Sequence, residues 1–238
     1  MSADFASTQL SHHFLIAMPG LEDPTFAKSV VYLCEQSERG AMGLIINKPG
    51  ELSLKHLFDK VELPLNREDL LQSNVLHGGP VQTERGFVLH DPMLEEDSIN
   101  SEISESLESS EPSEPSEPSE PSEPSEPSES SNLPLTPAKS NSIYASTLSV
   151  PGGLAMTTSK DVLEAMSNGS GPKRVLVTLG YASWGEGQLE SEIGENSWLT
   201  VEADPAVIFD TPIEKRYEKA LLLLGLQAWM LSSEAGHA

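Results

Sequence analysis

The glycine-rich turn at residues 179–186, LGYASWGE, combines residue types that suit binding of a small anion. Ser183 and Glu186 have the S-x-x-E spacing of a capping box, which predicts that a helix begins in this turn. Backbone N–H groups at a helix N-terminus after a glycine turn favour a phosphate or a carboxylate. The alternative is structural, because Glu186 would satisfy those N–H groups itself and glycines permit tight packing. The candidate ligand-binding residues of this turn are Gly180, Tyr181, Ser183 and Gly185.

Two further turns could converge with it if their strands share a sheet. One contains Asn47 and Lys48 before Pro-Gly, and the other contains Gly78 and Gly79 before a proline. Lys48 supplies a cation, and paired glycines allow a ligand to approach the backbone closely. The alternative role of these four candidate residues is turn formation.

Cys34 is the one cysteine of the chain and the candidate reactive thiol. Alternation along residues 30–35 places it on the same strand face as Val30 and Tyr32, as expected for a small buried apolar residue. The six histidines have no zinc-ligand spacing, and neither a GxSxG nor an HExxH motif occurs. The sequence therefore predicts no metal site and gives no reason to expect a cofactor.

The elements that would position these residues are short strands and a few helices. A helix is predicted at 54–61, with Ser53 as its cap, and another at 161–167. A third is predicted at 212–231, because Thr211 and Glu214 frame a capping box with Pro212 at the first helical position. Gly225 marks a kink or an early end of that helix. Strands are predicted at 14–18, 30–35, 42–47, 86–90, 143–148, 154–157, 175–180 and 207–209.

An acidic Ser/Glu/Pro-rich segment, 95–139, interrupts this pattern with six consecutive EPS triplets. Proline at every third position prevents a helix and favours an extended chain. We therefore predict one domain formed by residues 1–94 and 140–238, with a disordered insertion in a surface loop. The alternative function of the insertion is an acidic interaction arm.

Charge and cysteine usage restrict the class of protein. The formal net charge is −23, and removing the 13 acidic residues of 95–131 still leaves 24 acids against 14 bases. This acidity opposes direct nucleic-acid binding, which usually needs a basic face. A single cysteine fits a reducing compartment, and no apolar segment approaches the ~20 residues of a membrane span. We expect a cytoplasmic protein that does not enter a membrane.

Several segments together resemble the bacterial YqgE/AlgH family. They are HHFLIAMPG (12–20), SVVYLCE (29–35), GAMGLIINKP (40–49), HGGPVQTERGFVLHDP (77–92), TTSKDVLEAM (157–166), LGYASWGEGQLESEI (179–193) and ENSWLTVEAD (195–204). The resemblance implies an α+β fold with a mixed, bifurcated β-sheet curled into a pseudo-barrel and helices packed outside. It also implies a genetic association of some members with transcriptional regulation of exopolysaccharide production, but it supplies no agreed catalytic residues. The EPS-rich insertion departs from the shorter connection expected in this family.

Three functional hypotheses follow. The first is a regulatory or small-ligand-binding module, with a small anionic ligand or a protein as partner. The second is an enzyme of unknown reaction that uses a glycine-lined cleft with Cys34, Lys48 or Glu190, although nothing in the sequence fixes their geometry. The third is a transcriptional regulator that acts directly on DNA, which the acidic charge opposes and no helix-turn-helix supports.

Overall fold

The computed structural model describes residues 9–93 and 143–231, so the insertion predicted at 95–139 lies outside the described residues. The strands of the described part are β1 (His13–Ala17), β2 (Val30–Ser37), β3 (Gly40–Ile45), β4 (Pro49–Ser53), β5 (Asn74–His77), β6 (Val81–His90), β7 (Thr147–Val150), β8 (Leu154–Thr157), β9 (Val175–Gly185) and β10 (Trp198–Glu202). The helices are α1 (Leu54–Lys60), η1 (Glu68–Leu70), α3 (Asp161–Asn168), α4 (Gln188–Gly194), α5 (Pro205–Phe209), η2 (Ile213–Lys215), α6 (Arg216–Leu223) and η3 (Ala228–Met230).

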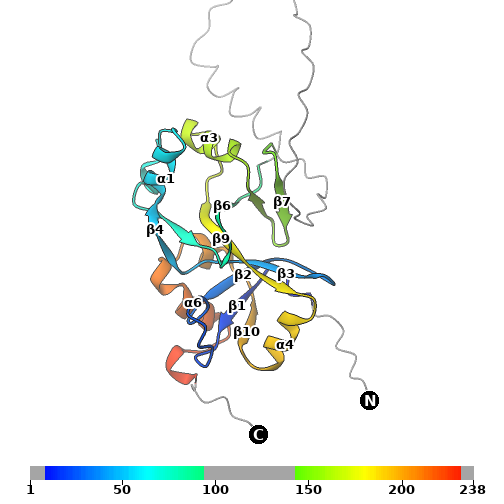
Figure 1. Cartoon of the computed structure of the whole chain (residues 1–238). Coiled ribbons are helices and arrows are strands. Elements are labelled where there is room, and N and C mark those ends of the chain that lie inside the picture. The colour runs from blue at the N-terminus through cyan, green and yellow to red at the C-terminus, as the bar shows by residue number, and fades with distance from the viewer. Residues whose placement is uncertain (1–8, 94–142, 232–238) are drawn as a thin grey trace, which may run out of the picture.

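The ten described strands form one mixed sheet in the order β10-β1-β2-β3-β9-β6-β8-β7, and β4 and β5 form a side branch. β9 creates the fork because its two halves have different neighbours. Its first half pairs with β5 in parallel and with β6 in antiparallel orientation, whereas its second half pairs with β3. Figure 1 shows the long β9 ribbon running from the part of the sheet near α3 to the part near α4. The α+β fold with a mixed, bifurcated, curled sheet is therefore confirmed.

Both faces of the central strands are buried, which explains their nearly continuous apolar sequences. Phe14 and Tyr32 belong to the cluster that also contains Ile208 and Leu221 from α5 and α6. The alternate residues of β1 and β2 lie in a second cluster, with Trp184, Leu189 and Trp198. A third cluster packs α1 and α3 against β5, β6 and β9. Within the described residues, no helix is long and apolar enough to cross a membrane.

Several predicted elements are present where the sequence places them. Ser53 caps α1 by accepting a hydrogen bond from the backbone N–H of His56 at 3.2 Å. α3 ends at Gly169, whose φ of +81° is the left-handed conformation that glycine adopts readily. The face shared by Val30, Tyr32 and Cys34 is also confirmed, because all three belong to the same core cluster.

Other predictions were wrong near the C-terminus. Residues 207–209 belong to a helix, α5, because Asp204 caps its N-terminus by accepting from the N–H of Ala206, and Pro205 occupies its first turn. The helix predicted at 212–231 is broken into η2, α6 and η3, and Gly225 follows the end of α6 with φ +71°. The capping box at 211–214 does not form, since the Thr211 hydroxyl donates instead to the carbonyl of Ala206.

The capping box predicted at Ser183 and Glu186 was also wrong. β9 continues through Ser183 to Gly185, and α4 begins only at Gln188, after Gly187 with φ +70°. The side chain of Gln188 turns back and accepts from the N–H of Gly185 at 3.0 Å. Three strands, β4, β5 and β10, were missed, and β7 begins later than the predicted 143–148 strand.

Candidate functional site

The structure brings together four of the sequence-predicted ligand residues, Gly78, Gly79, Gly180 and Tyr181. The N–H of Gly78 donates to the carbonyl of Leu179 at 2.8 Å, and the carbonyl of Gly78 accepts from the N–H of Ile45 at 2.8 Å. A Cβ atom on Gly78 or Gly79 would overlap the backbone of residues 180–182. The glycines therefore allow the start of β6, the end of β5 and the bend of β9 to contact one another directly. These three segments of backbone occupy the space that a ligand would need.

The remaining residues of these turns also have structural partners. The side chain of Asn47, just after β3, is held by the backbone at the start of β2: it accepts from the N–H of Val30 at 2.7 Å and donates to the carbonyl of Lys28 at 2.9 Å. The ammonium group of Lys48 donates to the carbonyl of Pro24 at 3.0 Å, and partial burial lowers its pKa. Ser183 and Gly185 lie farther along β9, where they pair with β3.

Cys34 is sealed in the core. Its side chain is 1% exposed, its thiol contacts the carbonyl of Tyr32 at 3.7 Å, and burial raises its pKa, with the charge of Glu35 acting in the same direction. A thiol is a nucleophile only as the thiolate, so this environment does not suit Cys34 for chemistry. Among residues 9–93 and 143–231, no group of three or more His, Cys, Asp or Glu side chains could hold a metal ion.

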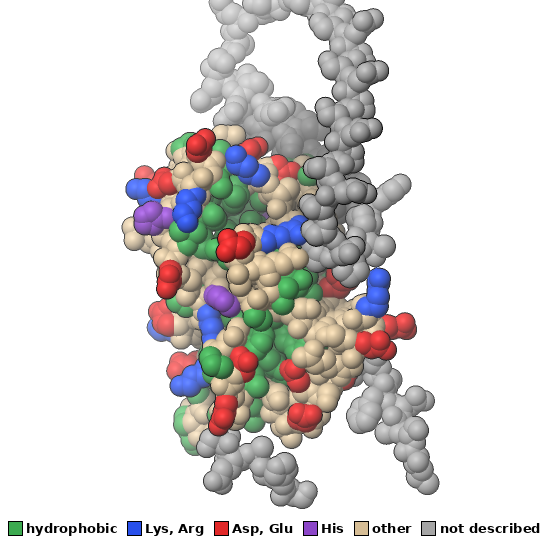
Figure 2. All heavy atoms as spheres, in the orientation of Figure 1, with side chains coloured by type: hydrophobic (Ala, Val, Ile, Leu, Met, Phe, Trp, Pro, Cys, Tyr) green, Lys and Arg blue, Asp and Glu red, His purple; other side chains and the backbone are tan. Residues whose placement is uncertain are grey.

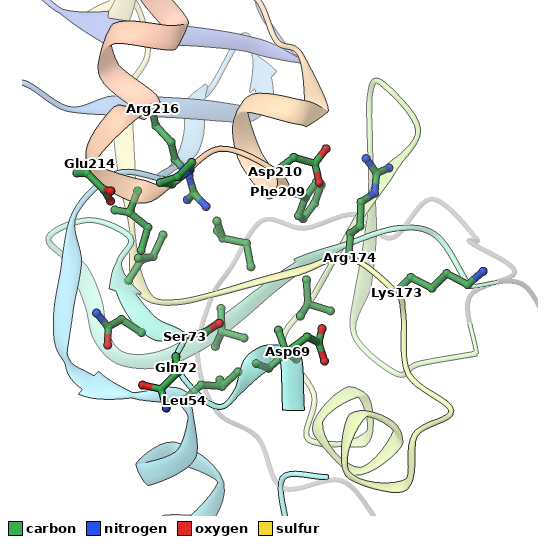
Figure 3. Close-up of a pocket in the computed structure, with 18 residues that line it drawn as sticks. Leu54, Asp69, Gln72, Ser73, Lys173, Arg174, Phe209, Asp210, Glu214 and Arg216 are labelled. Carbon is green, nitrogen blue, oxygen red and sulfur yellow. The ribbon is translucent and has the colours of Figure 1, made fainter. Parts of the chain in front are cut away.

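A pocket of about 480 Å³ lies elsewhere, between the first residues of β9 and the segment that joins α5 to α6. Its apolar lining includes Leu54, Leu76, Leu176, Phe209 and Ile213. None of the ligand residues predicted from the sequence lines it. Figure 3 shows the walls as they come together from the η1–β5 segment, the start of β9 and the C-terminal helices. Four parts of the chain therefore build this site: Leu54 at the start of α1, and residues within 69–76, 173–177 and 209–216.

Two ion pairs fix the rim of the pocket. Arg67 pairs with Asp69 at 2.6 Å and also donates to the carbonyls of Pro172 and Lys173, which holds η1 against the start of β9. Arg174 pairs with Asp91 at 2.5 Å, and its guanidinium lies 5.0 Å from the ring centre of Phe209. These hydrogen bonds hold the pKa values of both carboxyl groups below their usual range.

Arg216 lines the same pocket and is 7% exposed. Its Nε donates to the carbonyl of Thr211 at 3.0 Å, and its Nη1 donates to the carbonyl of Ile46. Both partners are neutral, and no carboxylate of the described residues lies within ion-pair distance of this guanidinium. Burial lowers the pKa of Arg216 to about 10, while the charge of Glu214 acts in the opposite direction. In Figure 3 the guanidinium points from α6 toward the cavity.

Comparison with known proteins places this architecture in a family. A sequence profile described as AlgH-like matches residues 14–115 and 127–229. The chain belongs to the AlgH-like family. Over its full length and theirs, it is 62% identical to a "UPF0301 protein" of Paracidovorax citrulli and 58% identical to one of Polaromonas sp.. These matches confirm the resemblance stated from the sequence segments.

Two solved structures share the fold. The solution structure of the AlgH protein from Pseudomonas aeruginosa is 39% identical, with a TM-score of 0.63, and the match covers 100% of both chains. A crystal structure of a Corynebacterium diphtheriae protein is 15% identical, with a TM-score of 0.57, and covers 93% of this chain and 88% of that one. The second likeness is one of fold alone.

Sequence reasoning missed the pocket because its residues carry no motif. Asp69, the adjacent pair Lys173 and Arg174, and Arg216 are separated by long stretches of chain, and each looks like an ordinary surface charge in the sequence. One local signal was available. Arg216 is on the buried side of α6, together with the fully buried apolar residues Ala220 and Leu221. A charged residue in the buried stripe of a helix is a reason to look for a partner or a ligand.

Proposed function

We propose that this AlgH-like chain is a cytoplasmic small-ligand-binding module with a regulatory role, and that the ligand occupies the pocket between β9 and the α5–α6 segment. The observation that carries the proposal is the pocket itself. Its volume of about 480 Å³ is typical of sites for small molecules, and its lining combines apolar side chains with polar and charged ones in equal number.

The pocket is a better candidate than the glycine turns for a geometric reason. The backbone groups of Gly78 already form hydrogen bonds, and the backbone segments that contain the glycines pack in direct contact, which leaves no space for a ligand. In the pocket, in contrast, Arg67 donates to the carbonyls of Pro172 and Lys173 and so joins the η1 wall to the start of β9 without a ligand. A preformed site loses less conformational entropy on binding.

Nothing in the described structure favours an enzyme or a DNA-binding protein over this proposal. Cys34 is buried, and Lys48 is held by a backbone carbonyl. Figure 2 shows acidic and basic side chains interspersed on one face of the described chain, without the basic stripe that a phosphate backbone would require.

The proposal can be tested by NMR titration of the full chain with a panel of nucleotides and metabolites. Ligand binding is expected to shift the amide resonances of pocket residues such as Ser73, Leu176 and Phe209. A ligand that instead shifts 78–80 and 180–187 would move the site back to the glycine turns. Silence across a broad panel would count against a ligand-binding role.

A pair of matched variants sharpens this test. Ser73→Trp places a large side chain at the pocket wall, whereas Ser183→Trp places the same side chain at an exposed position of β9. Any ligand found in the titration should lose affinity with Ser73→Trp and keep it with Ser183→Trp. The reverse pattern would contradict the proposed location.

A further inference from the structure

The side chain of Arg216 is a buried charged group of the pocket that forms no ion pair with the described residues. A guanidinium carries five N–H donors and a permanent positive charge. Two donors reach backbone carbonyls, which leaves three without an acceptor among the described residues. Removing a charge from water is unfavourable unless an opposite charge or full hydrogen bonding replaces the lost hydration.

The acidic groups around the pocket do not provide that opposite charge. Asp69 is paired with Arg67, and Asp91 at the rim is paired with Arg174. Glu214 influences the pKa of Arg216 but forms no ion pair with it, and both Glu214 and Asp210 are exposed. Figure 3 shows the carboxylates of Asp210 and Glu214 away from the tip of the Arg216 side chain.

We propose that Arg216 is the anchor for an anionic group of the ligand, so that the pocket takes a small organic anion with a carboxylate or phosphate on an apolar body. This inference rests on the proposed ligand-binding function and names the class of ligand. The two carbonyl contacts hold the guanidinium in place, and its free N–H groups match two oxygens of either anion. The apolar body contacts Leu176, Ile213 and the ring of Phe209, which line the same cavity.

Three ring compounds test the charge requirement: benzoate, phenyl phosphate and the neutral benzamide. Binding to the full chain is followed by NMR at constant ionic strength, together with the side-chain N–H signals of Arg216. At least one of the two anions should bind at least about tenfold more tightly than benzamide, because a charge-assisted hydrogen bond is stronger than a neutral one. The stronger of the two anions identifies the ligand group as a carboxylate or a phosphate.

Arg216→Gln should reduce the affinity for the preferred anion to that of benzamide, whereas Arg216→Lys, which keeps the charge, should retain part of the preference. Lys219→Gln is the matched control, because it removes one positive charge from an exposed position of the same helix, outside the pocket lining. If Arg216→Gln does not fold, the side-chain N–H signals of Arg216 in the wild-type protein test the assignment. We expect them to shift when an anion binds and to stay unchanged with benzamide.

The outcomes separate this inference from the proposed function. Equal binding of benzamide and both anions, or an anion preference that survives in folded Arg216→Gln, overturns the anion assignment. Binding of neutral members of the metabolite panel without binding of either anion also overturns the anion assignment, but it leaves the ligand-binding function in place. A pocket that binds no compound of any charge overturns both.

Discussion

Gly180→Ala tests whether the glycine turns are packed structure or an open cleft. Gly180 has φ +72°, a left-handed conformation that disfavours any residue with a Cβ by about 1–2 kcal/mol. A Cβ at this position would also lie 2.5 Å from the carbonyl oxygen of Gly79 and 2.9 Å from that of Val81. These are backbone atoms, so relief requires β6 to move, and overpacking of this kind adds about 1–3 kcal/mol. The expected loss in the free energy of unfolding is about 2–5 kcal/mol in total.

Gly169→Ala provides the control for the backbone term alone. Gly169 has φ +81°, and a Cβ added there would meet no neighbouring atom within 4 Å, so only the left-handed penalty of about 1–2 kcal/mol applies. Urea unfolding followed by circular dichroism gives both values under the same conditions. If Gly180→Ala destabilises no more than Gly169→Ala, the space beside Gly180 is open. The conclusion that the glycine turns leave no room for a ligand would then be wrong.

Three other predictions concern the core. Cys34 should react slowly with thiol reagents in the native protein and rapidly in denaturant, because burial raises its pKa, and fast native labelling would contradict its place in the core. Glu192→Ala should destabilise by about 2 kcal/mol and change tryptophan fluorescence, because Glu192 accepts from the indole N–H groups of Trp184 at 2.9 Å and Trp198 at 2.8 Å; an unchanged urea midpoint would refute this role. Burial lowers the pKa of His90, so the neutral form stabilises the fold: this contribution is complete above about pH 6.5 and declines as the pH falls toward the folded-state pKa. The stability difference between wild type and His90→Gln should therefore narrow as the pH falls below about 6.5, and a constant difference would count against the assignment.

The local elements predicted correctly are those whose signals are complete within a few residues. Ser53 with the apolar spacing after it predicts α1, and Gly169 predicts the end of α3. The run of apolar residues at 207–209 is too short to separate a strand from a helix by period, and the decisive signal was the Asp204-Pro205 pair before it. That pair has the cap and the first-turn proline of a helix start.

The errors around β9 have a tertiary cause. Ser183 and Glu186 satisfy the capping-box pattern, but the hydrogen bonds that β3 offers keep residues 182–185 in the strand. The sequence predicted that Gly78, Gly79 and Gly180 would lie close together if their strands shared a sheet. It did not predict whether the glycines would line a cleft or pack in contact, because both arrangements need glycine. The pocket depends on four segments meeting in space, and no local pattern encodes that meeting.

A crystal structure of the full chain with the preferred anion, benzoate or phenyl phosphate, tests the central claim most directly. We expect the ring to lie between Phe209 and Leu176, with oxygens of the anion about 3 Å from the guanidinium of Arg216. An anion bound beside Gly78 and Gly180, or an empty pocket in which the carboxylate of Glu214 pairs with Arg216, would contradict it.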